Sequence, residues 1–523
     1  MNVIEPVSSS LSLTTITLFL PLVGLLVLLF MKEEQKDQIK WTAFGFTIAT
    51  FIASLLMLFN FDSSNPGLQM AQRVSWLPQL GISYYVGVDG LSILLVLLST
   101  IIMPIGVLSS FRAGVLEERG RSKLYYMFML LLEWAMIGVF VVQDLIIFYI
   151  FWEVTLVPMY FLIGIWGSEN RVYAAVKFFL YTMAGSVLML IALLYVGGHA
   201  GTFAIPEIIA QVQAGNLNFT MDGVFSEQSY LFLGFLIAFA IKVPVWPLHS
   251  WLPDAHVQAP TAGSVILAGV LLKMGTYGMV RFNLPMFPEA SVAWAPIVAG
   301  LAVIGIVYGA WVSFAQTDLK KLVAYSSVSH LGFVVLGIFS LNEAGIQGAT
   351  LQMISHGIST GGLFLLVGML YERRHTKLMA AYGGIWKAMP LFGGISLIVS
   401  LSSMGLPGLN GFVGEFTILL GAVGSGVLSI GYALVGALGV ILAAVYILKM
   451  FQAVYMGDID KEENRNLPQM HWQEIAVMIP ILILIFWIGL QPSAWFDVMG
   501  ATTTNLVEGI AGFAPEILVQ ALR

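Results

Sequence analysis

The chain contains no cysteine, and only 10% of its 523 residues are charged. Without cysteine it cannot form disulfides, thiolate metal sites or cysteine-held iron–sulfur clusters. The low charge, the hydrophobic content of 58% and the mean hydropathy of +0.89 exclude an ordinary soluble domain. Apolar runs of about 18 residues or more recur along the chain and are too continuous for barrel strands. The sequence therefore predicts an all-α polytopic membrane protein.

Long polar linkers are also missing, so no soluble domain is expected between the apolar runs. The first ten residues contain no Lys or Arg, and no small-residue cleavage site follows the first run, which argues against a cleaved signal peptide. We expect about fourteen transmembrane helices. They lie near 11–31, 41–60, 86–111, 124–142, 145–166, 173–197, 229–252, 259–281, 294–314, 321–340, 346–370, 389–424, 428–456 and 474–492.

Basic residues are distributed unequally between alternate loops. If the loop at 32–40 faces the cytoplasm, sixteen of the 23 Lys and Arg residues lie on that side. Four are inside the membrane, and only Arg73, Arg281 and Arg523 lie on the other side. Because cytoplasmic loops carry the excess of Lys and Arg, this bias predicts both termini on the non-cytoplasmic side.

Two predicted spans are interrupted by residues that break helices. Residues 241–249 contain Pro244 and Pro247, and residues 405–412 contain Pro407 among three glycines. Paired interruptions in two halves of a membrane protein indicate repeats with a site at each break. We expect an N-terminal three-helix segment (1–123), five-helix repeats at 124–285 and 286–456, and a C-terminal helix and tail (457–523). Five spans per unit would make the two repeats inverted.

Ionisable side chains occur in the middle of apolar spans, where each costs at least about 2.5–3.5 kcal/mol on insertion scales. Such residues usually mark an ion path, and imidazoles pass protons near neutral pH. We interpret the set as a proton relay, against the alternatives of static ion pairs and ordinary core histidines. Its members are Glu153, Lys177, Lys242, Lys273, His330, His356, Glu415 and Lys449.

Within this set, Lys273 lies about 18 Å along its span, too deep to reach the interface. Lys177 is the expected partner of Glu153, either as a movable pair or as a static one. His249, Asp254 and His256 form either a cytoplasmic uptake site near Lys242 or a solvated loop with helix caps. Their spacing does not fit zinc, and the glycine-rich stretches lack the lysine of a phosphate loop.

Four segments closely resemble the antiporter-like membrane subunits of respiratory complex I. They read FWE at 151–153, AVKFFLYT at 175–182, KVPVWPLHSWLPDAHVQAPT at 242–261 and DLKKLVAYSSVSH at 318–330. The resemblance covers roughly residues 85–456. Among the three sister subunits, the length and the carboxylate in LPGLNGFVGE at 406–415 favour the M type, also called subunit 4, because the sisters typically carry a lysine there.

The resemblance implies a proton-pumping module of an NADH:quinone oxidoreductase in the bacterial plasma membrane or an equivalent energy-transducing membrane. It assigns coupling to Glu153 and Lys177, proton input to Lys242 and output to Glu415. It also places Lys273, His330 and His356 on the axis between them. FMN, iron–sulfur clusters and quinone are expected in partner subunits and none in this chain; the nearest partners are the two sister subunits.

Three alternatives stay open at this point. An Mrp-type cation/proton antiporter subunit shares the fold and the charged residues. The equivalent subunit of a membrane-bound hydrogenase or a plastid-type dehydrogenase would use the same pump with another electron donor. A purely structural membrane anchor would have to tolerate all the buried charges without using them.

Overall fold

The computed structural model describes residues 11–513. Within them, twelve helices are long and apolar enough to cross a membrane. These are α1 (Leu13–Phe30), α2 (Lys36–Phe59), α3 (Ser92–Ser109), α5 (Ser122–Val141), α6 with α7 (Leu145–Val154 and Leu156–Trp166), α8 (Arg171–Ala200), α12 to α14 (Thr261–Met286), α15 (Pro288–Ala315), α16 (Leu319–Phe339), α17 (Glu343–Arg374), α21 (Ile430–Tyr455) and α23 (Trp472–Leu490). The polytopic all-α architecture is therefore confirmed.

Both predicted interruptions occur in the structure. The first separates α10 (Glu227–Lys242) from α11 (Trp251–Gln258), and the second separates α19 (Pro390–Ser403) from α20 (Asn410–Val423). Proline removes backbone donors in the first break. In the second, Gly405 and Gly408 adopt positive φ angles of 79° and 90°, which favour glycine. Each half-helix is too short to cross a bilayer alone.

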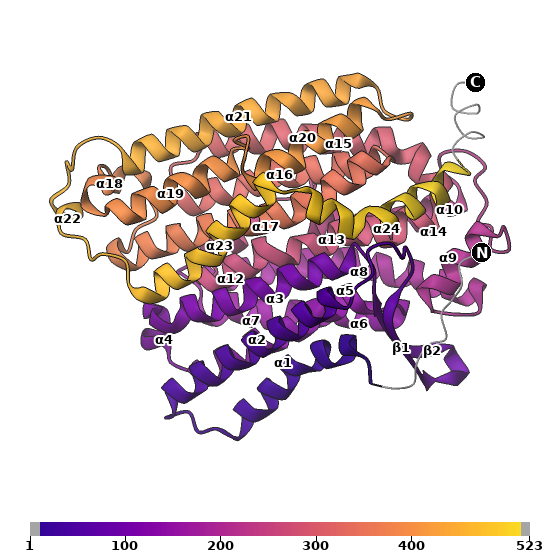
Figure 1. The fold of residues 1–523 in the computed structure, drawn as a ribbon, viewed down its shortest axis with the longest axis horizontal. Coiled ribbons are helices and arrows are strands. Elements are labelled where there is room, and N and C mark those ends of the chain that lie inside the picture. Colours follow the sequence, from indigo (N-terminus) through magenta and orange to yellow (C-terminus); the bar gives the residue numbers. More distant parts are fainter. Residues whose placement is uncertain (1–10, 514–523) are drawn as a thin grey trace.

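Figure 1 shows which helices and loops share each end of the bundle. The short helices α4 (Gly114–Arg119), α18 (Ile385–Ala388) and α22 (Glu462–Arg465) lie at one end, together with the Lys- and Arg-rich loops. We call this the basic end. Helix α1 begins and α24 (Ser493–Ala511) ends toward the opposite end. The terminal residues themselves, 1–10 and 514–523, lie outside the described part.

The opposite end contains structure that the sequence analysis did not anticipate. Strands β1 (Gln69–Leu77) and β2 (Ile82–Val88) form an antiparallel hairpin, so the chain is not helical throughout. The strands turn at Gly81, whose φ of 69° favours glycine. Helix α9 (Ile205–Gln213) lies in the loop near 198–228, and α24 follows the last span. These elements are too polar or too short to register as membrane spans.

Three helices form the centre of the bundle. The spans Thr261–Met286 and Glu343–Arg374 are wholly buried along their most apolar 18 residues, and Leu319–Phe339 is 94% buried over the same length. By contrast, α21 and α23 are 33% buried, so most of their surface faces outward. The central span Thr261–Met286 is also irregular, because π turns at η3 (Leu267–Leu271) and η4 (Met279–Asn283) flank α13 (Leu272–Gly278). Such turns recur at functional sites.

Candidate functional site: buried lysine, histidine and glutamate

Lys242 lies at the first break, as the last residue of α10, and is buried. Its Nζ is 3.4 Å from Thr155 Oγ1, at the junction of α6 and α7. The ammonium also lies over the rings of Trp152 and Phe178, 5.3 and 5.7 Å from their centroids. Cation–π contacts and one hydroxyl are weak compensation for burying a charge. The lysine is therefore held without a tight ion pair.

The expected pair of Glu153 and Lys177 does not form. Lys177 Nζ instead lies 2.7 Å from Asp254 Oδ2, which joins α8 to α11. Glu153 Oε1 is buried without a hydrogen-bond partner among residues 11–513, and the carboxylate interacts electrostatically with Lys242 and Tyr149. The sequence predicted the charges but not the pairing, because span order does not specify which helix faces which.

Lys273 is fully buried in α13 at the centre of the bundle. Its Nζ lies 2.7 Å from His356 Nδ1 on α17 and also donates to the carbonyl of Ala268 in the neighbouring π turn. His356 is buried, and its Nε2 has no hydrogen-bond partner among the described residues. The imidazole thus contacts a proton carrier on one side and has a free nitrogen on the other.

His330 and Glu415 make the second close contact, between α16 and α20. His330 Nδ1 lies 2.6 Å from Glu415 Oε1, and Tyr446 OH is 3.0 Å from His330 Nε2. Gln352 Nε2 donates to the same carboxylate oxygen at 3.0 Å, while Glu415 Oε2 has no partner among residues 11–513. The His330 and His356 ring centroids are 5.9 Å apart. The Lys273–His356 contact and the His330–Glu415 contact therefore lie along one line of titratable groups. The gap in this line is between the two histidine rings.

The second break is held by polar side chains next to Glu415. Asn410, the first residue of α20, accepts a hydrogen bond from Ser402 and donates to Ser359 Oγ at 3.1 Å. Ser359 and Ser402 hydroxyls are 2.6 Å apart. Backbone freed inside a membrane must be buried in protein or line a wet cavity. Here it is buried against hydroxyl and amide groups, beside the unpaired oxygen of the carboxylate.

Lys449 lies apart from these groups. It is exposed on α21, where its Nζ donates to Phe314 O at 2.7 Å and lies over the Phe314 ring, 4.1 Å from the centroid. The structure does not bring it to the chain formed by Lys273, the two histidines and Glu415. Its relay role stays a prediction that depends on contacts outside this chain.

Some buried groups were missed by sequence reasoning. Glu133 in α5 is fully buried, and neither carboxylate oxygen has a partner within residues 11–513. It sits in the apolar run 124–142, so the rule that found Glu153 should have found it too. Lys320 was counted with the loop residues but is buried in the first turn of α16. Arg281 forms a buried ion pair with Asp89 at 2.5 Å.

Outside the spanning segments, Lys377 stabilises the basic end. Its Nζ donates to Val257 O at 2.7 Å and to Ser168 Oγ at 3.1 Å. Burial lowers the pKa of Lys377, because desolvation disfavours the ammonium more than nearby Asp318 and Glu169 favour it. The lysine therefore connects the loop after α17 to the end of α11 and the start of α8.

Two family models together match most of the chain. The model described as NADH:quinone oxidoreductase/Mrp antiporter, TM, matches residues 142–443. The model described as NADH-ubiquinone oxidoreductase chain 4, amino terminus, matches residues 15–139. Together they include every residue of the predicted relay except Lys449, which lies just beyond residue 443.

Named relatives match over nearly their whole length. NADH-quinone oxidoreductase subunit M of Rhodobacter capsulatus is 44% identical over 506 residues, covering 95% of this chain and 96% of the relative. NADH-ubiquinone oxidoreductase chain 4 of Arabidopsis thaliana is 41% identical over 491 residues, covering 93% and 95%.

Solved structures share the fold. A chain of respiratory complex I from Thermus thermophilus with bound NADH has a TM-score of 0.84 and 30% identity, covering 95% of this chain and 99% of that one. A chain of the Mrp complex from Dietzia sp. DQ12-45-1b has a TM-score of 0.81 at 19% identity, covering 97% and 99%. At that identity the second match shows the fold alone.

Proposed function

Since this chain belongs to the family of subunit M, or chain 4, of NADH:quinone oxidoreductase, we propose that it is the proton-translocating subunit of such a complex. The membrane spans move protons, while electron transfer takes place in other subunits. We assign FMN, iron–sulfur clusters and quinone to partner subunits; the lack of cysteine here supports this for the clusters. The nearest partners are the two sister antiporter-like subunits.

The observation that carries the proposal is the pair of short contacts in the centre of the bundle. Lys273 Nζ to His356 Nδ1 is 2.7 Å, and His330 Nδ1 to Glu415 Oε1 is 2.6 Å. Amine, imidazole and carboxylate each bind and release a proton, so a proton can move along them without a metal or cofactor. The 5.9 Å between the histidine ring centroids leaves one step for a bridging water or a ring movement.

The path has two ends at the two broken helices. Lys242, beside Glu153, receives protons at the first break, and Glu415 releases them at the second. Glu153 interacts with Lys242 electrostatically, so displacement of Glu153 changes how readily Lys242 holds its proton. Lys177, paired with Asp254, lies within the same region and couples α8 to α11.

We place the protein in the bacterial plasma membrane or an equivalent energy-transducing membrane. Each broken helix completes one crossing, which brings the twelve long spans to the fourteen that the sequence predicts. The repeats 124–285 and 286–456 are inverted, each contains one broken helix, and both termini face the non-cytoplasmic side.

An Mrp-type antiporter is the second candidate, because one matching family model covers both kinds of subunit. The relatives with 41–44% identity favour the oxidoreductase, whereas the Mrp chain shares only the fold at 19% identity. Sodium-dependent transport by the purified protein without an electron donor would favour the antiporter. A purely structural anchor does not explain why the buried lysine, histidines and glutamate lie next to one another in space.

The test uses Lys273→Met in the intact complex, reconstituted in liposomes with NADH and a quinone. Methionine keeps an unbranched side chain of similar length but cannot carry a proton. We expect normal assembly and a loss of proton uptake per NADH oxidised. Lys321→Met is the matched control, because that lysine is exposed at the start of α16 and is not one of the predicted relay residues. Equal pumping by Lys273→Met and wild type, with assembly intact, would refute the proposed path.

A further inference from the structure

Both ring nitrogens of His330 have partners in the structure. Nδ1 lies 2.6 Å from Glu415 Oε1, and Nε2 lies 3.0 Å from the hydroxyl of Tyr446 on α21. Gln352 Nε2 also donates to Glu415 Oε1 at 3.0 Å, so this oxygen accepts hydrogen bonds as a carboxylate does. The pattern assigns the proton of the neutral imidazole to Nδ1, which donates to Glu415. Nε2 is then an acceptor, and the Tyr446 hydroxyl donates to it.

A proton that arrives from His356 can enter His330 only at Nε2, because Nδ1 already carries a proton. His356 Nδ1 is in contact with Lys273 Nζ at 2.7 Å. His356 Nε2 has no hydrogen-bond partner among residues 11–513, so it is the atom left to pass a proton onward. The centroids of the two histidine rings are 5.9 Å apart. The Tyr446 hydroxyl therefore occupies the one position at which His330 can receive a proton.

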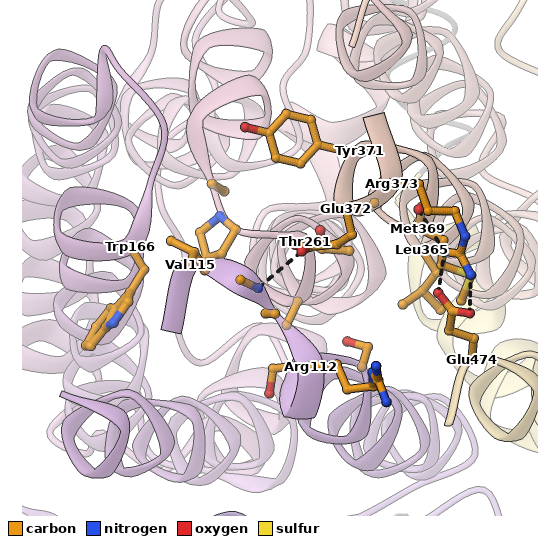
Figure 2. A pocket seen from close by; sticks show the side chains of 18 of the residues that line it. Arg112, Val115, Trp166, Thr261, Leu365, Met369, Tyr371, Glu372, Arg373 and Glu474 are labelled. Atoms are coloured by element: carbon orange, nitrogen blue, oxygen red, sulfur yellow. Dashed lines mark hydrogen bonds and ion pairs between the residues drawn. The ribbon is translucent and has the colours of Figure 1, made fainter. Parts of the chain in front are cut away.

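Two cavities at the ends of the bundle do not extend to these groups. The cavity at the basic end has a volume of about 410 Å³, and Figure 2 shows Glu372 next to Thr261 in its middle, with the ion pair of Arg373 and Glu474 at one side. The cavity at the opposite end, of about 680 Å³, is lined by Arg281 among others. Neither the two relay histidines nor the tyrosine line these two cavities. The step into the imidazole therefore relies on protein groups and at most on single buried waters.

Tyr446 points into the bundle from a helix that mostly faces outward. Helix α21 is 33% buried along its most apolar 18 residues, but Tyr446 is 0% exposed. Its hydroxyl also interacts with the side chain of Ser326 on α16. Ser326 donates its own proton to Val323 O at 2.8 Å, which leaves Ser326 Oγ as an acceptor. The tyrosine hydroxyl therefore has two acceptors, His330 Nε2 and Ser326 Oγ, and can turn between them.

We propose that Tyr446 is a further relay residue, whose hydroxyl passes protons from His356 to His330. A proton from His356 Nε2, carried across the gap by one water, binds the Tyr446 oxygen while the hydroxyl proton moves to His330 Nε2. His330 Nδ1 gives its proton to Glu415 Oε1. One O–H bond forms and one breaks at the tyrosine, so neither a tyrosinate nor electron transfer is involved. Ser326 Oγ accepts the hydroxyl proton while the group reorients for the next transfer.

This inference rests on the proposed function, because the tyrosine completes the same central path. The alternative is direct transfer from His356 to Glu415, whose Oε2 has no partner among the described residues. That route would use neither His330 nor Tyr446. A second alternative is that the tyrosine only packs the helices together. Both alternatives make measurable predictions that differ from those of the relay.

The first experiment compares Tyr446→Phe with Tyr432→Phe in the intact complex, reconstituted in liposomes. Each variant removes one hydroxyl and keeps the ring. Tyr432 is the matched control, because it lies on the same helix, about 21 Å away, and its hydroxyl donates to Pro296 O at 3.0 Å. We expect both complexes to assemble and only Tyr446→Phe to slow NADH-driven proton transport, by about ten-fold or more. This is less than the roughly 10²–10⁴-fold of a positioned acid–base group, because a water can take the place of the hydroxyl.

The second experiment combines Tyr446→Phe with His330→Gln, which removes the titratable ring. If the hydroxyl acts only by passing protons to His330, the double variant should transport protons as slowly as His330→Gln alone. A packing role would instead lower transport by a further factor. The non-additive result is therefore specific to a path that runs through both side chains.

Two results overturn the inference. If Tyr446→Phe transports protons as fast as Tyr432→Phe, the proton passes from His356 to Glu415 without the tyrosine. If the losses of Tyr446→Phe and His330→Gln multiply, the tyrosine is a packing residue. Failure of the proposed function is distinguishable, since Lys273→Met would then pump normally. If Lys273→Met blocks pumping and Tyr446→Phe has no effect, only the tyrosine step is wrong.

Discussion

Replacement of Glu415 by glutamine tests the output end of the path with little change in packing. The carboxylate oxygen Oε1 accepts hydrogen bonds from His330 Nδ1 at 2.6 Å and Gln352 Nε2 at 3.0 Å. An amide oxygen accepts the same two bonds, but the amide group neither binds nor releases a proton at accessible pH. We therefore expect Glu415→Gln to assemble normally and to stop proton release.

The stability cost follows from the bonds that change. A hydrogen bond to a charged group contributes about 1.5–3 kcal/mol and a neutral one about 0.5–1.5 kcal/mol, so weakening the two bonds in Glu415→Gln should cost about 2–3 kcal/mol. Glu415→Ala would leave both donors buried without an acceptor, at about 1–3 kcal/mol each. Glutamine therefore separates proton exchange from folding, whereas alanine confounds them.

Glu415→Asp provides the graded comparison. Aspartate keeps the carboxylate but is one methylene shorter, which withdraws it about 1.5 Å from His330. The direct contact then needs a bridging water, and we expect partial activity. The assay is NADH-driven acidification of liposomes that contain the purified complex, with quinone reduction measured in parallel. Wild-type pumping by an assembled Glu415→Gln complex would refute the output role, as would equal pumping by the Gln and Asp variants.

Further variants test the remaining groups. Lys273→Ala should lower proton uptake about as much as Lys242→Ala, and the double variant should match either single variant, because the two lysines act in series on one path; multiplying losses in liposomes would contradict this. Glu153→Ala should leave the complex assembled but lower pumping and quinone reduction, since the carboxylate acts on Lys242; normal coupled rates would count against it. Glu133→Leu should raise the thermal unfolding temperature and leave pumping unchanged, because it removes a buried carboxylate whose unmet hydrogen bonds cost about 1–3 kcal/mol; a lower unfolding temperature or reduced pumping would show that Glu133 has a partner or role outside this chain.

Sequence reasoning predicted the membrane spans well because their signal is one-dimensional. Hydrocarbon thickness sets a minimum length for each apolar run, so the runs can be read without knowing any contact. The breaks at Pro244 and Pro247 and at Pro407 could also be predicted without knowing any contact. Proline interrupts its own helix, because it has no backbone N–H and clashes with the preceding turn. The polar hairpin β1–β2 was missed because most of its residues, 69–88, lie between the apolar runs 41–60 and 86–111.

The pairing of charges was less accessible. Sequence order suggested that Lys177, one span after Glu153, would meet that carboxylate, but it meets Asp254 on α11. A pair between two helices depends on their rotation and neighbours, which the position of a charge within a run does not specify. The contact of Lys273 with His356, 83 residues later in the chain, likewise depends on how two helices are rotated and packed.

The rotation of a helix about its own axis is hardest to predict from the sequence for the helices that carry the site. A helix at the edge of a bundle has an outward face that differs in composition from its inward face, which gives a periodic pattern. The spans Thr261–Met286 and Glu343–Arg374 are buried all round, so they have no outward face to reveal their orientation. For this reason Lys273, His330 and His356 could be named as members of one relay but not placed in order. The same burial hides His256 and Lys320, because a polar residue near a proline-rich loop or a helix start is expected to meet water. The packing of α11 against α16 buries both residues and brings Lys320 Nζ to 2.7 Å from Ala259 O.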